Sequence, residues 1–398
     1  MKETIKFTIE VDIKEPSLKE IMEAFKKAIL ECFQTFVNKV LMRYAKEYKK
    51  NGELNRLLDC SKVTWKTSKG NKMTSIFTIF GKIRVPQIQV KNHDTGKRVY
   101  ISRLLLGIEA RKRVPEITTK MLGLMGALSP YRVVRKIVSM FTEVRFTLMT
   151  ILRSVRKTGE GIDFTVKPDE TGEFEADGTG LPIIKGGKRG KELKVLAQRK
   201  QNGGIRIAGM IIGKYKGGWG KLFKPIKKVL KTFGEIFLVT DGDVSILKGI
   251  KGIRVIIQRC LFHIPHETKY TLWKDKVKRR SEDWAYILAK VLEITNIKRI
   301  RDRTEIAENI IKWKKEHLIK LIDFCRNKGY NHTAIYLENA RENIFGGIER
   351  RAMGGTTSLI ERVMRTINAR IDIAQWSERT ALAVAKIRGA YYYNGFDV

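Results

Sequence analysis

Apolar residues recur at three- and four-residue steps over residues 17–50, and this period predicts one long amphipathic helix. The positions that carry the period are Leu18, Ile21, Phe25, Ile29, Phe33, Phe36, Val40 and Tyr44. Ser17 directly precedes them and is a residue type that caps helix N-termini. We therefore expect a helical N-terminal region over residues 1–58.

The pattern changes twice within residues 59–160. Short alternating runs between residues 63 and 101 predict a small β-ribbon. Helical periodicity then returns in three pieces, over residues 115–128, 129–141 and about 143–157. The three helices resemble a helix-turn-helix unit, in which Arg132 and Arg135 would contact DNA, but a plain three-helix packing unit fits the pattern equally well.

The second half of the chain has the pattern of an α/β domain. Strands are predicted at residues 173–177, 192–199, 205–212, 235–241 and 253–260, with helices at 219–233 and ending near 249. This order, three strands and then two strands each reached through a helix, is the one that the ribonuclease-H-like fold uses. Residues 271–345 are helical and charged, so we expect an all-helical insertion within a catalytic domain formed by residues 161–270 and 346–398.

The charge of the chain indicates a polyanionic partner. Among 398 residues, 79 Lys and Arg outnumber 42 Asp and Glu, which gives a net charge of +37, while 43% of residues are hydrophobic. That apolar content supports folded domains, and nucleic acid fits the excess charge because each neutralised phosphate releases counterions. With no long apolar segment, no signal-peptide pattern and four scattered cysteines, we expect a soluble, cytoplasmic, nucleoid-associated protein.

Basic residues are concentrated between residues 178 and 231, where fifteen Lys and Arg accompany a single acid, Glu192. Such one-signed density predicts a face that binds phosphate groups. We assign Lys188, Arg189 and Lys191 to it because they lie in and beside a glycine-rich loop, which can approach a DNA backbone closely.

Asp177 and Asp241 are the first candidates for chemistry, because each closes a predicted strand and precedes a glycine. Taken alone, an Asp-Gly pair is more typical of a turn. In the ribonuclease-H-like arrangement, however, the first and fourth strands are neighbours, so the two carboxylates would lie side by side. Hard oxygen ligands of this kind suit Mg²⁺, with Mn²⁺ as a substitute.

A third carboxylate is expected from a helix near the end of the chain. Glu361 lies in the first turn of the helix predicted to start near residue 357, although Ser358 and Glu361 also have the spacing of a capping box. Glu349 follows a similar glycine-containing stretch and competes for the same role.

These acidic residues and their surroundings resemble the mutator-type DDE transposases of prokaryotic insertion sequences, over most of the chain. Asp177 and Asp241 are 64 residues apart, and Asp241 and Glu361 are 120 apart. Residues 78–84, 96–100 and 104–107 look like the N-terminal half of one branch of that family. Residues 355–361, 369–370 and 376–377 resemble the block around its catalytic glutamate, which favours Glu361 over Glu349.

The resemblance implies a transposase that binds the terminal inverted repeats of its element through residues 60–158. It would cleave the ends with divalent metal ions held by Asp177, Asp241 and Glu361, and join the freed 3′-hydroxyl to target DNA. A homodimer on double-stranded DNA is expected, because two ends are processed together. Arg362 and Arg365, on the same helix as Glu361, are assigned as phosphate contacts.

The family's Cys-x-x-His element maps onto Cys260 and His263, which implies a structural or DNA-end-positioning role. Spacing alone would also allow a zinc site made by Cys260, His263 and His266, without a fourth ligand. Trp273, Trp284 and Trp313 are either helix core or stacking platforms for an unpaired base. Two other functions remain open: a metal-dependent ribonuclease-H-like nuclease, and a domesticated DNA-binding protein without strand transfer.

Overall fold

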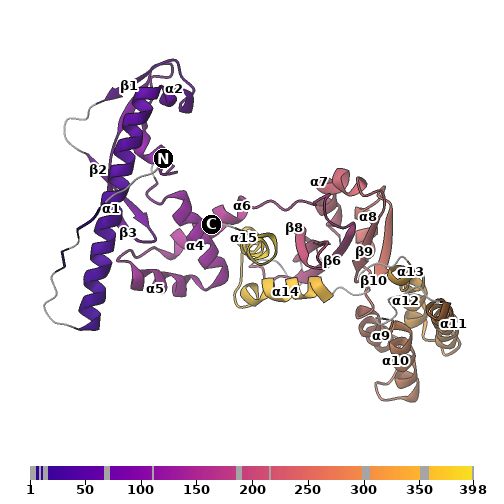
Figure 1. The fold of residues 1–398 in the computed structure, drawn as a ribbon. Coiled ribbons are helices and arrows are strands. Elements are labelled where there is room, and N and C mark those ends of the chain that lie inside the picture. The colour runs from indigo at the N-terminus through magenta and orange to yellow at the C-terminus, as the bar shows by residue number, and fades with distance from the viewer. Residues whose placement is uncertain are drawn as a thin grey trace. The chain divides into compact units, whose positions relative to one another are not determined.

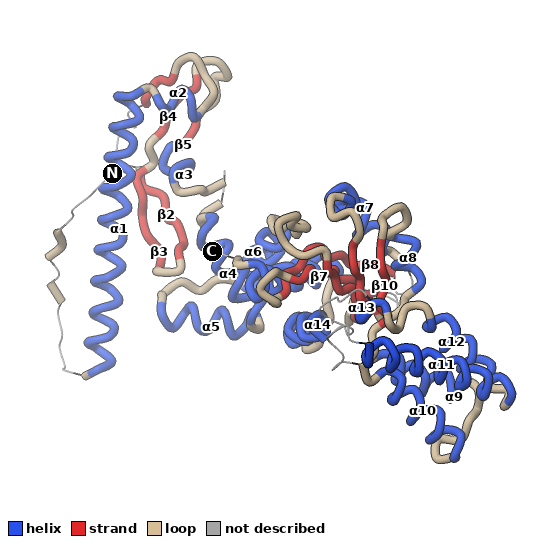
Figure 2. Tube along the Cα trace, turned by 45° about the vertical axis from the view of Figure 1, so that its right-hand side comes forward, coloured by secondary structure: helices blue, strands red, loops and turns tan. Residues whose placement is uncertain are grey.

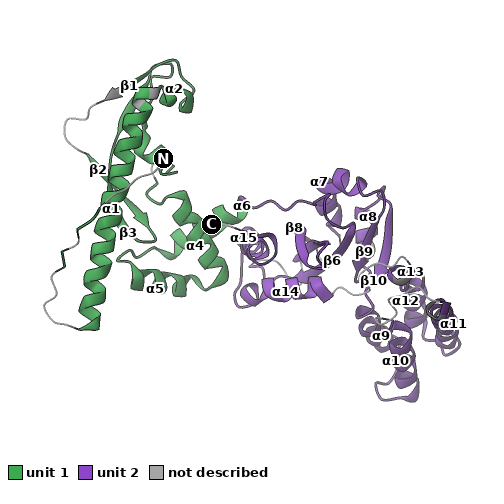
Figure 3. Ribbon diagram, in the orientation of Figure 1, with its two compact units in different colours: residues 1–159, 398 green, residues 160–397 purple. Residues whose placement is uncertain are grey.

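The computed structural model describes residues 6–8, 10–11, 17–66, 72–109, 112–184, 191–214, 217–297, 305–349 and 358–396. The chain divides into two compact units, residues 1–159 and 160–397 (Figure 3). Both contain helices and strands, so the protein is a mixed α/β protein. In the described ranges, no helix combines the length and the apolar character that crossing a membrane requires.

The first unit is built on the long helix α1 (Leu18–Asn51), as the periodicity predicts (Figure 1). Ser17 Oγ accepts a hydrogen bond from the Glu20 N–H at 3.2 Å, and Gly52 ends the helix in the left-handed conformation with φ of 65°. The short helix α2 (Glu53–Leu57) follows directly. Leu41 of α1 packs on Ile83 and Val85, which ties the helix to the strands that follow.

The predicted β-ribbon is two small antiparallel sheets rather than one. Strands β2 (Met73–Thr78) and β3 (Gly81–Pro86) form a hairpin, and β1 (Val63–Lys66), β4 (Gln89–Asn92) and β5 (Arg98–Tyr100) form a three-stranded sheet in the order β1-β4-β5. A short helix, α3 (Ile101–Leu105), follows β5. Figure 2 shows the hairpin beside α1.

Three helices complete the first unit: α4 (Glu116–Leu128), α5 (Tyr131–Phe141) and α6 (Leu148–Glu160). The prediction started the third helix near residue 143, five residues too early. Thr147 is the physical reason, since its hydroxyl accepts from the Thr150 N–H at 3.1 Å and starts the helix there. The segment before it alternates instead, which buries Val144 and Phe146 in the core that the three helices share.

A mixed five-stranded sheet forms the centre of the second unit. Its strands are β6 (Glu173–Gly180), β7 (Lys191–Arg199), β8 (Ile205–Lys214), β9 (Ile236–Thr240) and β10 (Val255–Arg259), in the order β10-β9-β6-β7-β8. β6, β7 and β8 are an antiparallel meander, whereas β9 runs parallel to β6 and β10 runs parallel to β9. The prediction that the first and fourth strands are neighbours is therefore confirmed.

Helices cover both faces of this sheet. On one face, Trp219 and Phe223 of α7 (Trp219–Lys231) share a core with Phe174 of β6 and with Ile246 of α8 (Val244–Gly249). On the other face lie α14 (Ser358–Ile371) and α15 (Glu378–Gly389), which continues into a π-helical turn (Ala390–Asn394). Because side chains alternate along β6, the residues next to Phe174 and Ala176 point toward α14.

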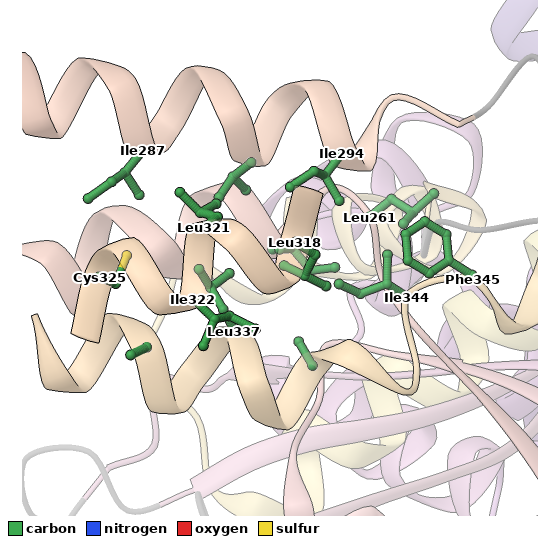
Figure 4. Packing of buried hydrophobic residues seen from close by; sticks show 14 of the residues in the cluster. Leu261, Ile287, Ile294, Leu318, Leu321, Ile322, Cys325, Leu337, Ile344 and Phe345 are labelled. Carbon is green, nitrogen blue, oxygen red and sulfur yellow. The ribbon is translucent and has the colours of Figure 1, made fainter. Parts of the chain in front are cut away.

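A helical block lies in the sequence between β10 and α14, where the insertion was expected. It contains α9 (His263–Lys274), α10 (Glu282–Thr295), α11 (Glu305–Asn327), α12 (Asn331–Arg341) and α13 (Gly346–Glu349). The block has its own buried core, which Figure 4 shows between facing helices and which includes Ile287, Leu318, Leu321 and Leu337. A core of its own indicates that the block adds to the sheet domain without replacing any part of it.

Candidate active site

Asp177 lies inside β6 and not at its end, so the sequence-based placement was wrong. The strand continues three residues further to Gly180, because Asp177, Gly178 and Gly180 pair with Val195, Lys194 and Glu192 of β7. A side chain at position 178 would collide with the Glu192 carboxylate. Gly178 therefore leaves room for the Glu192 side chain in this position and does not form a turn.

Asp241, in contrast, ends its strand as predicted. It follows β9 directly, and Gly242 turns the chain with φ of 99°. The Asp241 carboxylate accepts a hydrogen bond from the Asp243 N–H at 2.9 Å, and Asp243 in turn caps α8 through the Ser245 N–H at 2.8 Å. Since β9 and β6 are paired, this turn holds Asp241 beside the strand that carries Asp177.

Glu361 reaches Asp177 because α14 is docked on the face of β6 where Asp177 lies. Glu175 and Thr179, two residues to either side of Asp177, share that face. Glu175 Oε2 accepts from the Ile360 N–H at 3.0 Å, and Thr179 Oγ1 accepts from the Asn368 side-chain amide at 2.8 Å. These two contacts fix the register of α14 on the strand.

The charges of Asp241 and Glu361 both act on Asp177. Burial, together with these two charges, raises the pKa of Asp177 to about 7, while the Gly178 N–H and His263 oppose the shift. Three carboxylates from β6, the end of β9 and α14 therefore share one local environment. Among the described residues, the ligand atoms that lie within 4.8 Å of one another are those of Cys260, His263 and Glu361, and not those of the three acids. Ionising all three carboxylates costs free energy unless a positive charge lies near them.

Cys260 and His263 lie against this group. Cys260 is fully buried just after β10, His263 begins α9, and their ligand atoms lie within 4.8 Å of each other and of a Glu361 carboxylate oxygen. The hydrogen bond to Cys260 is the largest cause that raises the pKa of His263, to about 9, with help from Asp177 and Asp241. The imidazole is therefore protonated at neutral pH.

Cys260, His263 and His266, the zinc ligands that spacing alone would allow, do not come together. The His266 side chain is 70% exposed and lies 3.8 Å from Glu267, outside the group that Cys260 and His263 form. His266 lies about one helical turn beyond His263 on α9, and its side chain is turned to solvent instead of toward Cys260. The third residue beside Cys260 and His263 is Glu361 instead.

Glu192 is an acidic residue that sequence reasoning treated only as an exception in a basic stretch. It lines an open pocket of about 580 Å³ together with Asp241, Asp243, Arg259 and His263. Its carboxylate pairs at 2.5 Å with the ammonium of Lys194, which is completely buried and lies 4.9 Å from the Trp219 ring centre. The sequence contained a sign of this pair, because Glu192 and Lys194 are two residues apart in a predicted strand and side chains at that spacing lie on the same face.

Glu175 was missed entirely. Its side chain is fully buried, and Oε1 pairs with the Arg199 guanidinium at 2.5 Å. Burial raises the pKa of Glu175, and Arg199 opposes that rise. Glu173, Glu175 and Asp177 alternate along β6, so the repeating acids were the only local sign that this face of the strand carries charge.

The predicted DNA contacts are dispersed over the molecule. Arg132 and Arg135 are exposed on α5 of the first unit, and Arg362 and Arg365 are exposed on α14 of the second. Lys191 forms an ion pair with Glu378 at 2.9 Å, and Lys188 and Arg189 lie outside the described residues.

Glu349 and the three tryptophans, the remaining candidates from the sequence, differ in their burial and in their partners. Glu349 pairs with Lys315 of α11 and has no part in the electrostatics of Asp177. Trp284 packs against the core of the helical block, whereas Trp273 and Trp313 are 67% and 41% exposed. Trp273 stacks with Tyr270, with ring centres 5.8 Å apart.

The donors at this site suit two kinds of cation. Asp177, Asp241 and Glu361 offer carboxylate oxygens, the ligands that Mg²⁺ and Mn²⁺ prefer, and Cys260 with His263 would favour a softer ion.

No protein-family model matches the chain, and a search of curated protein sequences found no match.

Proposed function

We propose that this protein is a DNA transposase of the DDE type, whose second unit is a ribonuclease-H-like catalytic domain. The observation that carries the proposal is the common electrostatic environment of Asp177, Asp241 and Glu361, three acids that are far apart in the sequence. Each comes from a different element of the unit, and the sequence alone predicts each of them as a site residue.

The sheet supports the fold assignment. An antiparallel meander followed by two parallel strands, with the first strand in the centre, is the arrangement that the ribonuclease-H-like fold uses. The helical block enters after the fifth strand and before the helix with Glu361, which agrees with an insertion domain.

The acids fit a divalent metal ion. Asp177 holds a proton up to about pH 7 because it is buried beside Asp241 and Glu361, and a cation at this position would remove that repulsion. When bound, Mg²⁺ would supply the electrostatic stabilisation and the activated oxygen nucleophile that phosphodiester hydrolysis and strand transfer need.

The residues around the acids have separable tasks. Glu175 and Thr179 hold α14 against β6, so that Glu361 stays opposite Asp177. Protonated His263 cannot accept a proton at neutral pH, and we assign it to the attraction of a DNA phosphate near the acids. Exposed Arg362 and Arg365 on α14 are the further phosphate contacts that the proposal requires.

DNA binding would begin in the first unit. α5 exposes Arg132, Arg135 and Lys136 together, and the whole chain carries a net charge of +37. Phosphate contacts of this kind provide affinity and orientation without sequence information. We propose terminal inverted repeats as the bound DNA and a homodimer as the active form, because two ends are cut and joined together.

The test is an assay of cleavage and joining with purified protein, Mg²⁺ and DNA from the flanks of the coding region. We expect 3′-hydroxyl products and their transfer to a second duplex from the wild type, and at least about a 100-fold loss in Asp241→Asn. Asp323→Asn, at an exposed position of α11, is the matched control and should be fully active. Normal cutting by Asp241→Asn would overturn the proposal, and cutting without joining would identify a nuclease.

A further inference from the structure

A second cavity adjoins the pocket that contains Asp241. It has a volume of about 300 Å³ and shares Gly242, Asp243, Arg259 and Tyr336 with the larger pocket. It lies between the carboxyl ends of β9 and β10, helix α8 and helix α12. The cavity is therefore a side chamber of the candidate active site, and its wall begins at the residue after Asp241.

The walls of this chamber are held firmly. The Arg259 N–H donates to the Asn343 carbonyl at 2.7 Å, and the buried Gln258 side chain bonds to the Ile344 carbonyl and to the Gly347 N–H, both at 2.7 Å. These bonds attach the end of β10 to the chain after α12. The chamber is thus formed in advance, as ligand pockets usually are.

The chamber is lined by both apolar and polar side chains. Ile246, Leu247 and Ile257 are its apolar residues. Asn339 and Asn343, four residues apart in the sequence, also line it and offer both donors and acceptors. The Arg259 guanidinium carbon lies 4.7 Å from the centre of the Tyr336 ring, so a cation and an aromatic ring also line the chamber.

Two polar atoms in this wall need a partner. Arg259 Nε and Tyr336 Oη are both buried, and neither has a hydrogen-bond partner of normal geometry among the described residues. Burial raises the pKa of Tyr336 to about 12, so its hydroxyl remains a donor at neutral pH. Buried polar atoms without partners are rare because they destabilise the fold, and a ligand that bonds to them removes that cost.

The chemistry of the chamber selects among ligand classes. The only acid in its wall, Asp243, already accepts hydrogen bonds from Ser245 and from the Trp219 indole, which argues against a cation. Arg259 is its only positive charge, and half of the wall is apolar, which argues against a phosphate group. A flat heterocycle with mixed donors and acceptors matches two carboxamides, a phenol and a guanidinium.

We infer that this chamber binds one unpaired nucleobase of the DNA strand next to the bond that is cut. The inference rests on the proposed function for the identity of the strand. The base would lie against Ile246, Leu247 and Ile257 while Asn339 and Asn343 bond to its edge, as enzymes do with bases taken out of the helical stack. Holding that base fixes the neighbouring phosphate beside Asp241, because Gly242 belongs to both cavities.

The experiment measures binding without divalent ions, so that no cleavage takes place. Two labelled 20-base-pair duplexes are compared by fluorescence anisotropy in EDTA, one with a single bulged adenosine and one with a reduced abasic residue at the same position. We expect the full-length protein to bind the adenosine duplex about five-fold or more tightly, the ordinary effect of one stacked base. Asn339→Ala/Asn343→Ala should bind both duplexes equally, with unchanged affinity for the abasic one.

Asn331→Ala, at an exposed position of the same helix, is the matched control and should retain the preference. If the double variant melts at a lower temperature than the wild type, Asn339→Ala alone replaces it, since Asn339 is exposed and we expect its substitution to leave the melting temperature unchanged. Equal binding of the two duplexes by the wild type, or an intact preference in the chamber variants, would overturn the inference.

The two proposals fail separately. If the wild type shows no base preference but still cleaves and joins DNA, the inference about the chamber is overturned and the transposase proposal remains. A retained preference together with normal cutting by Asp241→Asn would remove the transposase chemistry and leave a protein that binds unpaired bases.

Discussion

The buried carboxylate of Glu175 accepts a hydrogen bond from the Ile360 N–H at 3.0 Å, and so joins the strand that carries Asp177 to the helix that carries Glu361. The same carboxylate pairs with Arg199 at 2.5 Å, which holds it in place. An anion at a helix N-terminus also interacts favourably with the helix dipole. Two acids of the site thus depend on a third acid that does not itself face the pocket.

Replacing Glu175 should therefore affect the site through Glu361. We expect Glu175→Gln to reduce end cleavage roughly 10-fold or more, since a charged hydrogen bond is worth about 1.5–3 kcal/mol. When Glu361→Gln is already present, adding Glu175→Gln should cause no further loss of activity, because the Glu361 carboxylate that Glu175 positions is absent. A full additional loss in that background would assign Glu175 a role independent of Glu361.

The stability of the metal-free protein should depend on pH through Asp177. Its folded-state pKa of about 7 lies above the ordinary value of 3.8, so the folded protein binds more protons than the unfolded chain between these values. The sign follows: stability falls as pH rises from about 4 to about 7. Asp177→Asn should reduce this slope, as measured by thermal melting in EDTA across that range, while the raised pKa values of Glu175 and Glu192 leave a residual slope of the same sign. An unchanged slope would show that Asp177 is not a titrating group.

His263 should change the stability in the same direction as Asp177, but over a higher pH range. Its pKa is raised to about 9, mainly by Cys260, so its stabilising charge is complete below about pH 6.5 and disappears as pH rises through 9. We expect the ring signals of His263 in NMR titrations of the metal-free protein to have a midpoint near 9, and Cys260→Ala to lower it. Cys32→Ala, in the first unit, serves as the control, and a midpoint that Cys260→Ala leaves unchanged would contradict this pairing.

Much of this architecture could be predicted from periodicity. The long helix α1, the meander of β6, β7 and β8, and the pairing of β6 with β9 all follow local hydrophobic patterns and strand order. The position of Asp177 within its strand did not follow. Glycines after an aspartate indicate a turn locally, whereas pairing with β7 extends β6 past them, and pairing is a tertiary property.

The supporting ion pairs were also hidden for a physical reason. Glu175 and Arg199 are 24 residues apart in the sequence and meet only because β6 and β7 are antiparallel neighbours. Glu192 and Lys194 are close in sequence, but their charges read as part of a basic surface until burial shows Lys194 to be fully enclosed. Burial, and not residue type, separates these pairs from solvated charges.

The proposed chemistry requires one cation shared by Asp177, Asp241 and Glu361. The most direct test measures Mn²⁺ binding by electron paramagnetic resonance in Asp177→Asn, Asp241→Asn and Glu361→Gln. Glu349→Gln is the control, because the Glu349 carboxylate forms an ion pair with Lys315 instead. We predict that each of the first three weakens Mn²⁺ binding by about 10-fold or more, as loss of a metal-site contact typically does, and that Glu349→Gln binds like the wild type. Wild-type affinity in the first three variants would contradict the claim.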